Sequence, residues 1–107
     1  MDKKKSIEII KKFVNKLKKD YQINQIIFFG SRVSGKPHKD SDIDIIIVSD
    51  DFEGMNRLHR GANMYKYWDA LVPVDFLCYT PKEFNILKKR ISIVKEALEN
   101  GILIQSN

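Results

Sequence analysis

The chain has 107 residues, which suffice for one domain with a buried core and leave little room for a second. Its 19 basic and 14 acidic side chains give a net charge of +5. No apolar run approaches the roughly 20 residues of a membrane-spanning helix, and lysines interrupt the apolar residues near the N-terminus, unlike in a signal peptide. One cysteine, Cys78, excludes an internal disulfide. We therefore expect a single cytoplasmic domain over residues 1–107 that does not contact a membrane.

The first 20 residues carry the whole charge excess. Eight lysines stand there against three acidic side chains, whereas the other 87 residues hold 11 of each sign. Apolar residues recur at helical spacing, at Ile7, Ile10, Phe13, Leu17 and Tyr21. This pattern predicts a basic amphipathic helix over about 4–20, with Ser6 as its N-cap. We expect its lysine-rich face to be solvated. Nucleic-acid binding is the less favoured alternative because no aromatic side chains alternate with the lysines.

The segment that follows, about 23–80, is predicted to be the catalytic core. It opens with a strand over 24–30, a glycine-containing loop over 31–40 and an isoleucine-rich strand over 42–49. Gly30 and Ser31 end the first strand, and Asp42 and Asp44 open the second. Alternate residues of a strand share a face, so the two carboxylates point the same way, about 7 Å apart. Such a pair repels unless a cation lies between, and Mg²⁺ prefers oxygen ligands of this kind.

Three other interpretations compete for these residues. A calcium-binding EF-hand loop starting at Asp40 needs Gly and Glu at its sixth and twelfth positions, where this chain has Ile45 and Asp51. Residues 30–36 follow a Walker A pattern, but Pro37 lacks the hydroxyl that binds Mg²⁺, and no room remains for the helix that should follow. The third interpretation is that the aspartates and glycines only form turns. It stays open, although the combined spacing disfavours it.

Further along the chain, a turn is predicted over 51–54, a helix over 55–70, and a strand that begins at Pro73. Asp75 lies in the middle of this apolar strand. A buried acid there requires a metal ion or a cationic partner, or else hydrogen bonds from the backbone. Cys78, three residues further on, is expected to face the opposite layer and belong to the core. Asp69 is the alternative acidic residue, although its neighbours look like the end of a helix.

The C-terminal part is predicted to be helical over about 81–100. Thr80 and Glu83 form a capping box around a proline, which is a strong helix start. Apolar residues at helical spacing continue the helix to about residue 100, with a break near Arg90. Gly101 is a typical helix stop, and residues 102–104 are expected to form a short additional strand.

The spacing Gly30-Ser31, ten residues, Asp42-x-Asp44 resembles the signature of the polymerase-β-like nucleotidyltransferases. The chain as a whole is similar to their smallest members, the minimal nucleotidyltransferases of bacteria and archaea. The resemblance implies an α/β (α+β) two-layer fold, with a small mixed β-sheet, helices packed on one face and the aspartates exposed on the other. It also implies a third catalytic carboxylate on the next strand, the place that Asp75 occupies.

The same resemblance implies the chemistry. Two Mg²⁺ ions and ATP are expected, with AMP transferred to a hydroxyl and pyrophosphate released. Asp42 and Asp44 would hold both metals, while Asp75 would complete the metal site and accept the proton of the attacking hydroxyl. Arg32 would support the loop or the triphosphate, with a surface salt bridge as the alternative, and Ser41 would orient the turn. The expected nucleotide-binding residues are Gly30, Ser31, Arg32 and Ser41.

A partner is implied as well. Minimal nucleotidyltransferases commonly pair with a HEPN-domain protein as the antitoxin of a toxin–antitoxin system, and silence the toxin by AMPylation of a tyrosine. The alternative is a non-catalytic antitoxin, or a regulatory nucleotide-binding module, that acts by forming a complex. No feature of the sequence favours a particular oligomeric state.

Overall fold

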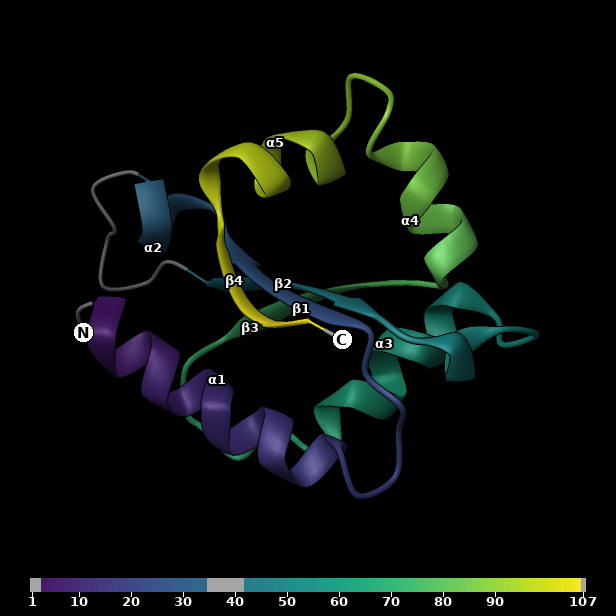
Figure 1. Cartoon of the computed structure of the whole chain (residues 1–107). Helices are drawn as coiled ribbons and strands as arrows, with labels where there is room; N and C mark the ends of the chain where they lie inside the picture. The colour runs from purple at the N-terminus through teal and green to yellow at the C-terminus, as the bar shows by residue number, and fades with distance from the viewer. Residues whose placement is uncertain (1–2, 35–41, 107) are drawn as a thin grey trace.

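A computed structural model describes residues 3–34 and 42–106. A four-stranded sheet forms its centre, in the order β3-β2-β1-β4 (Figure 1). β2 and β3 are parallel, whereas β1 is antiparallel to both β2 and β4, so the sheet is mixed as predicted. In chain order the elements are α1 (Lys3–Leu17), β1 (Gln25–Phe29), α2 (Ser31–Ser34), β2 (Ile43–Val48), the 3₁₀ helix η1 (Asp50–Phe52), α3 (Arg57–Tyr65), β3 (Val74–Tyr79), α4 (Pro81–Leu87), α5 (Ile93–Asn100) and β4 (Ile102–Ser106).

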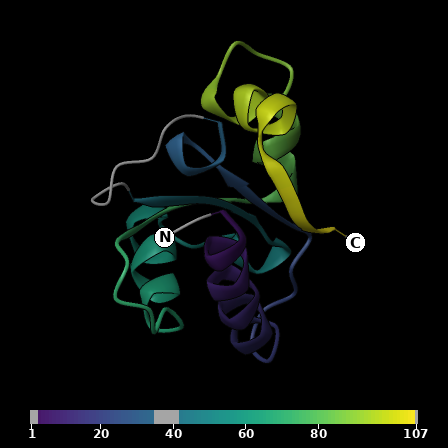
Figure 2. The same cartoon turned by 90° about the vertical axis from the view of Figure 1, so that its left-hand side faces the viewer.

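Helices cover both faces of this sheet. Ile43, Ile45 and Ile47 of β2 pack into the core layer that contains α1 and α3. Ile46 and Val48 point the other way, into a smaller layer beneath α4 and α5. Figure 2 shows the two pairs of helices on opposite sides of the sheet. The mixed sheet and the α+β class are therefore confirmed, but the expectation that the helices pack on one face holds for α1 and α3 only. Strands that are apolar on both faces need cover on both.

The amphipathic N-terminal helix is confirmed as α1. It buries Ile10, Phe13, Val14 and Leu17 against the sheet, and its lysines are exposed. Ser6 is not its N-cap, because the helix already begins at Lys3 and the serine is fully buried within it. In the described ranges, no helix combines the length and the apolar composition that crossing a bilayer would need.

The C-terminal segment forms two helices, separated near Arg90 as expected. The Thr80 hydroxyl accepts from the Glu83 amide at 3.2 Å, and the Glu83 carboxylate accepts from the Thr80 amide at 2.8 Å, which confirms the capping box at the start of α4. Gly101 ends α5, where a Cβ atom would lie 2.4 Å from the Ala97 carbonyl oxygen. The close approach lets the chain turn directly into β4, which pairs with β1.

A buried guanidinium ties β3 to both of its neighbouring helices. Arg60 of α3 is only 5% exposed, and its Nη1 atom donates to the Cys78 carbonyl at 3.2 Å and to Glu83 Oε1 at 2.6 Å. Burial acts to raise the pKa of Glu83, but the hydrogen bond and charge of Arg60 outweigh it and leave that pKa below its ordinary value. Cys78 itself is buried core, as predicted, and burial raises the pKa of its thiol to about 12.

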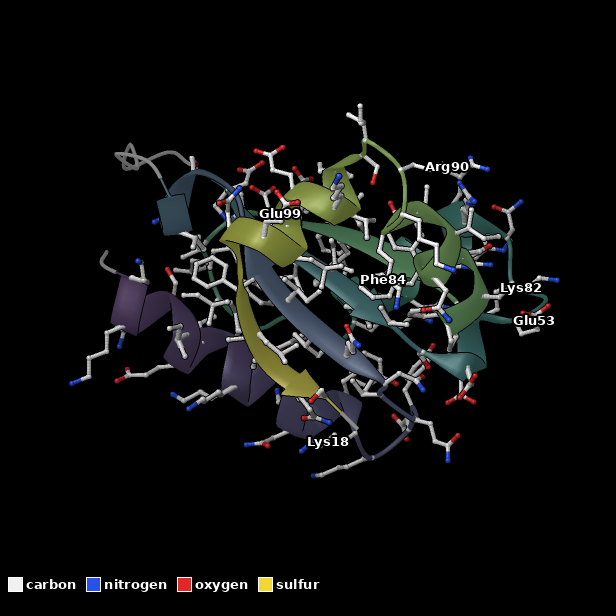
Figure 3. All side chains as sticks on the ribbon, turned by 45° about the horizontal axis from the view of Figure 1, so that its top comes forward. Lys18, Glu53, Lys82, Phe84, Arg90 and Glu99 are labelled. Atoms are coloured by element: carbon white, nitrogen blue, oxygen red, sulfur yellow. The ribbon has the colours of Figure 1, made fainter. Side chains whose placement is uncertain are left out.

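Removal of Glu83 should therefore destabilise the fold. Glu83→Ala leaves the Arg60 guanidinium buried without its carboxylate and removes half of a capping box, at a cost of about 2–3 kcal/mol in the free energy of unfolding. Urea denaturation at pH 7 measures this free energy. Glu99→Ala is the matched control, because that side chain is exposed and points outward from α5 in Figure 3. Equal effects of the two substitutions would contradict the assigned role of Glu83.

The effect should also depend on pH. The folded-state pKa of Glu83 lies below its unfolded value, so its contribution is complete above the unfolded pKa and is lost as the pH falls through the folded pKa. The stability difference between the wild type and Glu83→Gln should thus be full above about pH 5 and shrink below about pH 4. A series of urea denaturation curves between pH 3 and pH 7 measures it.

Candidate active site

Gly30 and Asp44 meet where β1 and β2 lie side by side. Phe29 is the cross-strand partner of Asp44, so the turn after β1 begins beside this carboxylate. Gly30 has a φ of +90°, and a Cβ atom on it would lie 2.1 Å from Asp44 Oδ2. Only glycine fits both the backbone conformation and the space. The turn and the carboxylate are thus in direct contact, as the spacing of the sequence predicts.

Asp75 lies beside Asp44 on the next strand. The two residues are partners in the parallel register of β2 and β3, with neighbouring strands about 4.8 Å apart, so both side chains stand on one face of the sheet. Ile46 and Leu77 lie on the same face of the sheet as these two aspartates. Asp42 precedes Asp44 by two residues and is half-buried. The structure therefore brings all three predicted carboxylates to one end of one face.

The expectation that Asp75 is buried was wrong. Its side chain is exposed, because β3 is an edge strand and nothing pairs with its outer side among the described residues. The argument that a buried acid needs a cationic partner applies instead to Asp44, which is half-buried. Burial raises the pKa of Asp44 to about 6, with further contributions from the nearby charges of Asp75 and Asp42. The carboxylates are thus close enough to repel one another.

The donor set fits a divalent metal ion. Carboxylate oxygens from adjacent strand positions are hard ligands of the kind that Mg²⁺ binds, and a cation would relieve the repulsion around Asp44. Within residues 3–34 and 42–106, no three Asp, Glu, His or Cys side chains lie close enough together to hold a metal ion. The backbone register already places Asp44 beside Asp75.

Two of the other predicted nucleotide-binding residues follow the turn in α2. Ser31 is exposed and begins the short helix α2, in which the Val33 amide donates to the Gly30 carbonyl at 3.0 Å. Arg32 is 5% exposed, so it does not form a salt bridge on the surface, and support of the loop or of the triphosphate stays its predicted role. Ser41 lies outside the described residues. Asp69 is exposed after α3 and forms an ion pair with Lys16, away from the other aspartates.

A pocket of about 250 Å³ opens beside Asp44 and Gly30. Its other wall is α5, which contributes Glu96 and Asn100, and these residues were not expected from the sequence. Their spacing of four places them on one helix face, but only the fold shows which face meets the site. A larger pocket of about 490 Å³ lies between α1 and residues 67–70 and contains none of the three catalytic candidates. We assign the site to the smaller pocket because Asp44 and the Gly30 turn line it.

A family profile described as the nucleotidyltransferase domain matches residues 10–104. The chain therefore belongs to the nucleotidyltransferase domain family, as the spacing of its glycine, serine and aspartates indicates. A Methanocaldococcus jannaschii protein assigned as a protein adenylyltransferase is 53% identical over 47 residues. That match covers 41% of this chain and 47% of the relative, so the chain spans about half the length of this curated protein.

Solved structures agree on the fold. A Sulfolobus solfataricus protein assigned as a nucleotidyltransferase superposes with a TM-score of 0.64 at 21% identity, covering 91% of this chain and 77% of that one. A toxin–antitoxin complex with AMP-PNP superposes with a TM-score of 0.54 at 21% identity, covering 89% of this chain and 72% of that one. A mutant of the MntA–HpeT toxin–antitoxin superposes with a TM-score of 0.53 at 19% identity, covering 88% of this chain and 71% of that one. At these identities the structures confirm the fold class.

The contact between Gly30 and Asp44 can be tested with three glycines of this chain. Gly54 has a φ of +80° but open space around it, so Gly54→Ala should cost only the backbone strain of about 1–2 kcal/mol. Gly30→Ala adds a collision with Asp44 and should cost a further 1–3 kcal/mol or so, with loss of nucleotide binding. Gly61→Ala, in an open position of α3, should stabilise the fold by about 0.5–1 kcal/mol. Urea denaturation and calorimetric titration with ATP and Mg²⁺ measure these effects, and equal costs at Gly30 and Gly54 would contradict the assigned contact.

Proposed function

We propose that this nucleotidyltransferase transfers AMP from ATP to a tyrosine of a HEPN-domain toxin and is the antitoxin of that pair, in the cytoplasm. The observation that carries the proposal is the placement of Asp44 between the Gly30 turn and Asp75. The name of the Methanocaldococcus jannaschii relative supports protein as the acceptor, and two of the structural neighbours are toxin–antitoxin complexes. One of those complexes contains AMP-PNP, which supports ATP as the donor.

Each residue has a distinct role in this proposal. Asp42, Asp44 and Asp75 would hold two Mg²⁺ ions, which supply charge neutralisation at the triphosphate and lower the pKa of the acceptor hydroxyl. The Gly30 amide and the Ser31 hydroxyl would hold the β- and γ-phosphates, with Arg32 and Ser41 supporting the turn. The acceptor oxygen attacks the α-phosphorus, pyrophosphate leaves, and Asp75 takes the hydroxyl proton. Exposure of Asp75 at the sheet edge suits this last role, since an acceptor must reach it.

A second candidate function is inhibition by binding alone. The same carboxylates would then form a metal-stabilised scaffold, and the chain would be a non-catalytic antitoxin or a regulatory nucleotide-binding module. The contact between Gly30 and Asp44 favours catalysis, because a scaffold does not need a glycine turn with a positive φ pressed against a half-buried carboxylate.

The proposal expects a HEPN-domain protein to be encoded beside this chain, and intact-mass analysis of that protein tests it. After incubation with the chain, ATP and Mg²⁺, that protein should gain one or more AMP units on tyrosine. Asp44→Asn should slow the transfer by about two to three orders of magnitude, since it removes a charge that the transition state requires. Asp69→Asn is the matched control, because Asp69 is exposed and pairs with Lys16 away from the site.

The outcomes separate the two candidates. Transfer that persists at the wild-type rate in Asp44→Asn would contradict the assigned mechanism. If no AMP is gained and the toxin is still inhibited by the double variant Asp42→Asn, Asp44→Asn, the binding-only function is correct. Circular dichroism and urea denaturation of each variant establish that the fold is retained.

A further inference from the structure

A tyrosine of the chain itself binds the backbone next to Asp75. Tyr65 is the last residue of α3, and its hydroxyl donates to the Val74 carbonyl oxygen at 2.5 Å. Val74 directly precedes Asp75 in β3, so the phenol oxygen meets the outer edge of the strand one residue before this exposed aspartate. Tyr65 is 50% exposed, and solvent or a ligand can therefore reach it. Its ring is fixed by an edge-to-face contact with Phe76 at 5.0 Å between centroids.

The charges of the site act on this hydroxyl. The pKa of Tyr65 is raised, first by burial and then by the carboxylates of Asp75 and Asp42. Two of the three catalytic candidates thus lie within electrostatic range of one phenol oxygen. The proton of that oxygen is engaged with the Val74 carbonyl, which leaves the lone pairs of the oxygen available.

The other three tyrosines are placed differently. Tyr67 donates to Asp20 at 2.7 Å near the end of α1, and Tyr21 packs against Phe52 and Tyr67. Tyr79 ends β3, four residues from Asp75, which is about 13 Å along a strand. All four tyrosines are described by the structure, and Tyr65 is the one whose hydroxyl binds the backbone of the residue before a catalytic candidate.

A purely structural role for Tyr65 also has support. Trp68 Nε1 donates to the Val72 carbonyl at 2.9 Å, and Arg60 Nη1 donates to the Cys78 carbonyl. Side chains in and just after α3 therefore donate to several backbone carbonyls in and just before β3. Tyr65 makes the same kind of bond, to the Val74 carbonyl. It differs from the other two donors because a phenol oxygen is a nucleophile that can accept a phosphoryl group, whereas an indole or a guanidinium is not.

We propose that Tyr65 is an acceptor of AMP within the chain's own active site. The inference rests on the proposed function, because it uses the same ATP and the same carboxylates. The Tyr65 oxygen forms a bond to the α-phosphorus, the bond from that phosphorus to the bridging oxygen of the β-phosphate breaks, and pyrophosphate leaves. The phenolic proton passes to a carboxylate oxygen of Asp75. The product is tyrosine-O-AMP on α3, beside the site that formed it.

Self-modification of this kind limits the enzyme. AMP on Tyr65 replaces the hydrogen that binds the Val74 carbonyl and occupies the space around Asp75 through which an external acceptor approaches. A chain that has modified itself should therefore lose transfer to its partner. Because the partner's tyrosine competes for the same position, its presence should reduce modification of Tyr65.

The test is intact-mass analysis and peptide mapping of the chain, incubated with ATP and Mg²⁺ both alone and with the HEPN-domain protein. The chain alone should gain one AMP unit on Tyr65. The gain should be lost in Tyr65→Phe and Asp44→Asn and kept in the matched control Tyr67→Phe. In a mixture of Asp44→Asn chain and Tyr65→Phe chain, neither should be modified, because the first has the acceptor and the second the active site.

Each result decides the matter. AMP on the partner but none on the chain overturns the inference and leaves the proposed function standing. AMP on another residue of the chain, or on the Asp44→Asn chain of the mixture, overturns Tyr65 as an acceptor in its own site. AMP on neither protein overturns both the inference and the proposed function.

A measurement without turnover gives an independent check. The α,β-methylene analogue of ATP cannot release pyrophosphate, so with Mg²⁺ it fills the site and remains. It should slow iodination of Tyr65 several-fold and leave that of Tyr67 unchanged. Equal iodination of Tyr65 with and without the analogue would mean that the phenol lies outside the site, and would overturn the inference.

Discussion

The packing of one carboxylate against a glycine turn is the constraint on which this site depends. Asp44 is half-buried beside Gly30, and its neighbours Asp42 and Asp75 carry charges of the same sign. Burial and repulsion both disfavour the ionised form, which is why the pKa of Asp44 rises to about 6. A cation bound at this position would reverse the balance, since the crowded carboxylates would become its ligands. The arrangement is unfavourable without an ion and would become favourable with one.

The parallel pairing of β2 and β3 determines which carboxylates meet. Asp44 faces Asp75 only in the observed register, and a slip of one residue would turn Asp75 to the α1 and α3 side. The Ile43 amide donates to the Pro73 carbonyl at 2.9 Å and fixes the start of this ladder. At the other end, the hydrogen bonds of Arg60 to Cys78 and Glu83 tie β3 to α3 and α4. Groups outside the candidate site therefore hold Asp44 and Asp75 in place.

Local patterns predicted the features that depend on local geometry. The Gly30 turn, the alternation of β2, the capping box at Thr80 and the stop at Gly101 each depend on residues close in sequence. The exposure of Asp75 could not be predicted, because an apolar strand has the same sequence pattern in the centre of a sheet as at its edge. The cover of the second face by α4 and α5, and the wall that α5 contributes to the pocket, also follow from strand order rather than from any local pattern.

The edge position of β3 also bears on the chemistry. A carboxylate that holds a metal ion benefits from burial, which strengthens its attraction to the ion, whereas one that meets an acceptor hydroxyl must be reachable. Asp44 and Asp75 lie side by side yet differ in exposure in this way, because one is in an inner strand and the other at the edge. Tyr65, whose phenol donates to the Val74 carbonyl, lies at this edge, where an acceptor hydroxyl would reach Asp75. The unpaired edge of β3 therefore explains both how an external acceptor would reach Asp75 and why Tyr65 can bind the strand so near it.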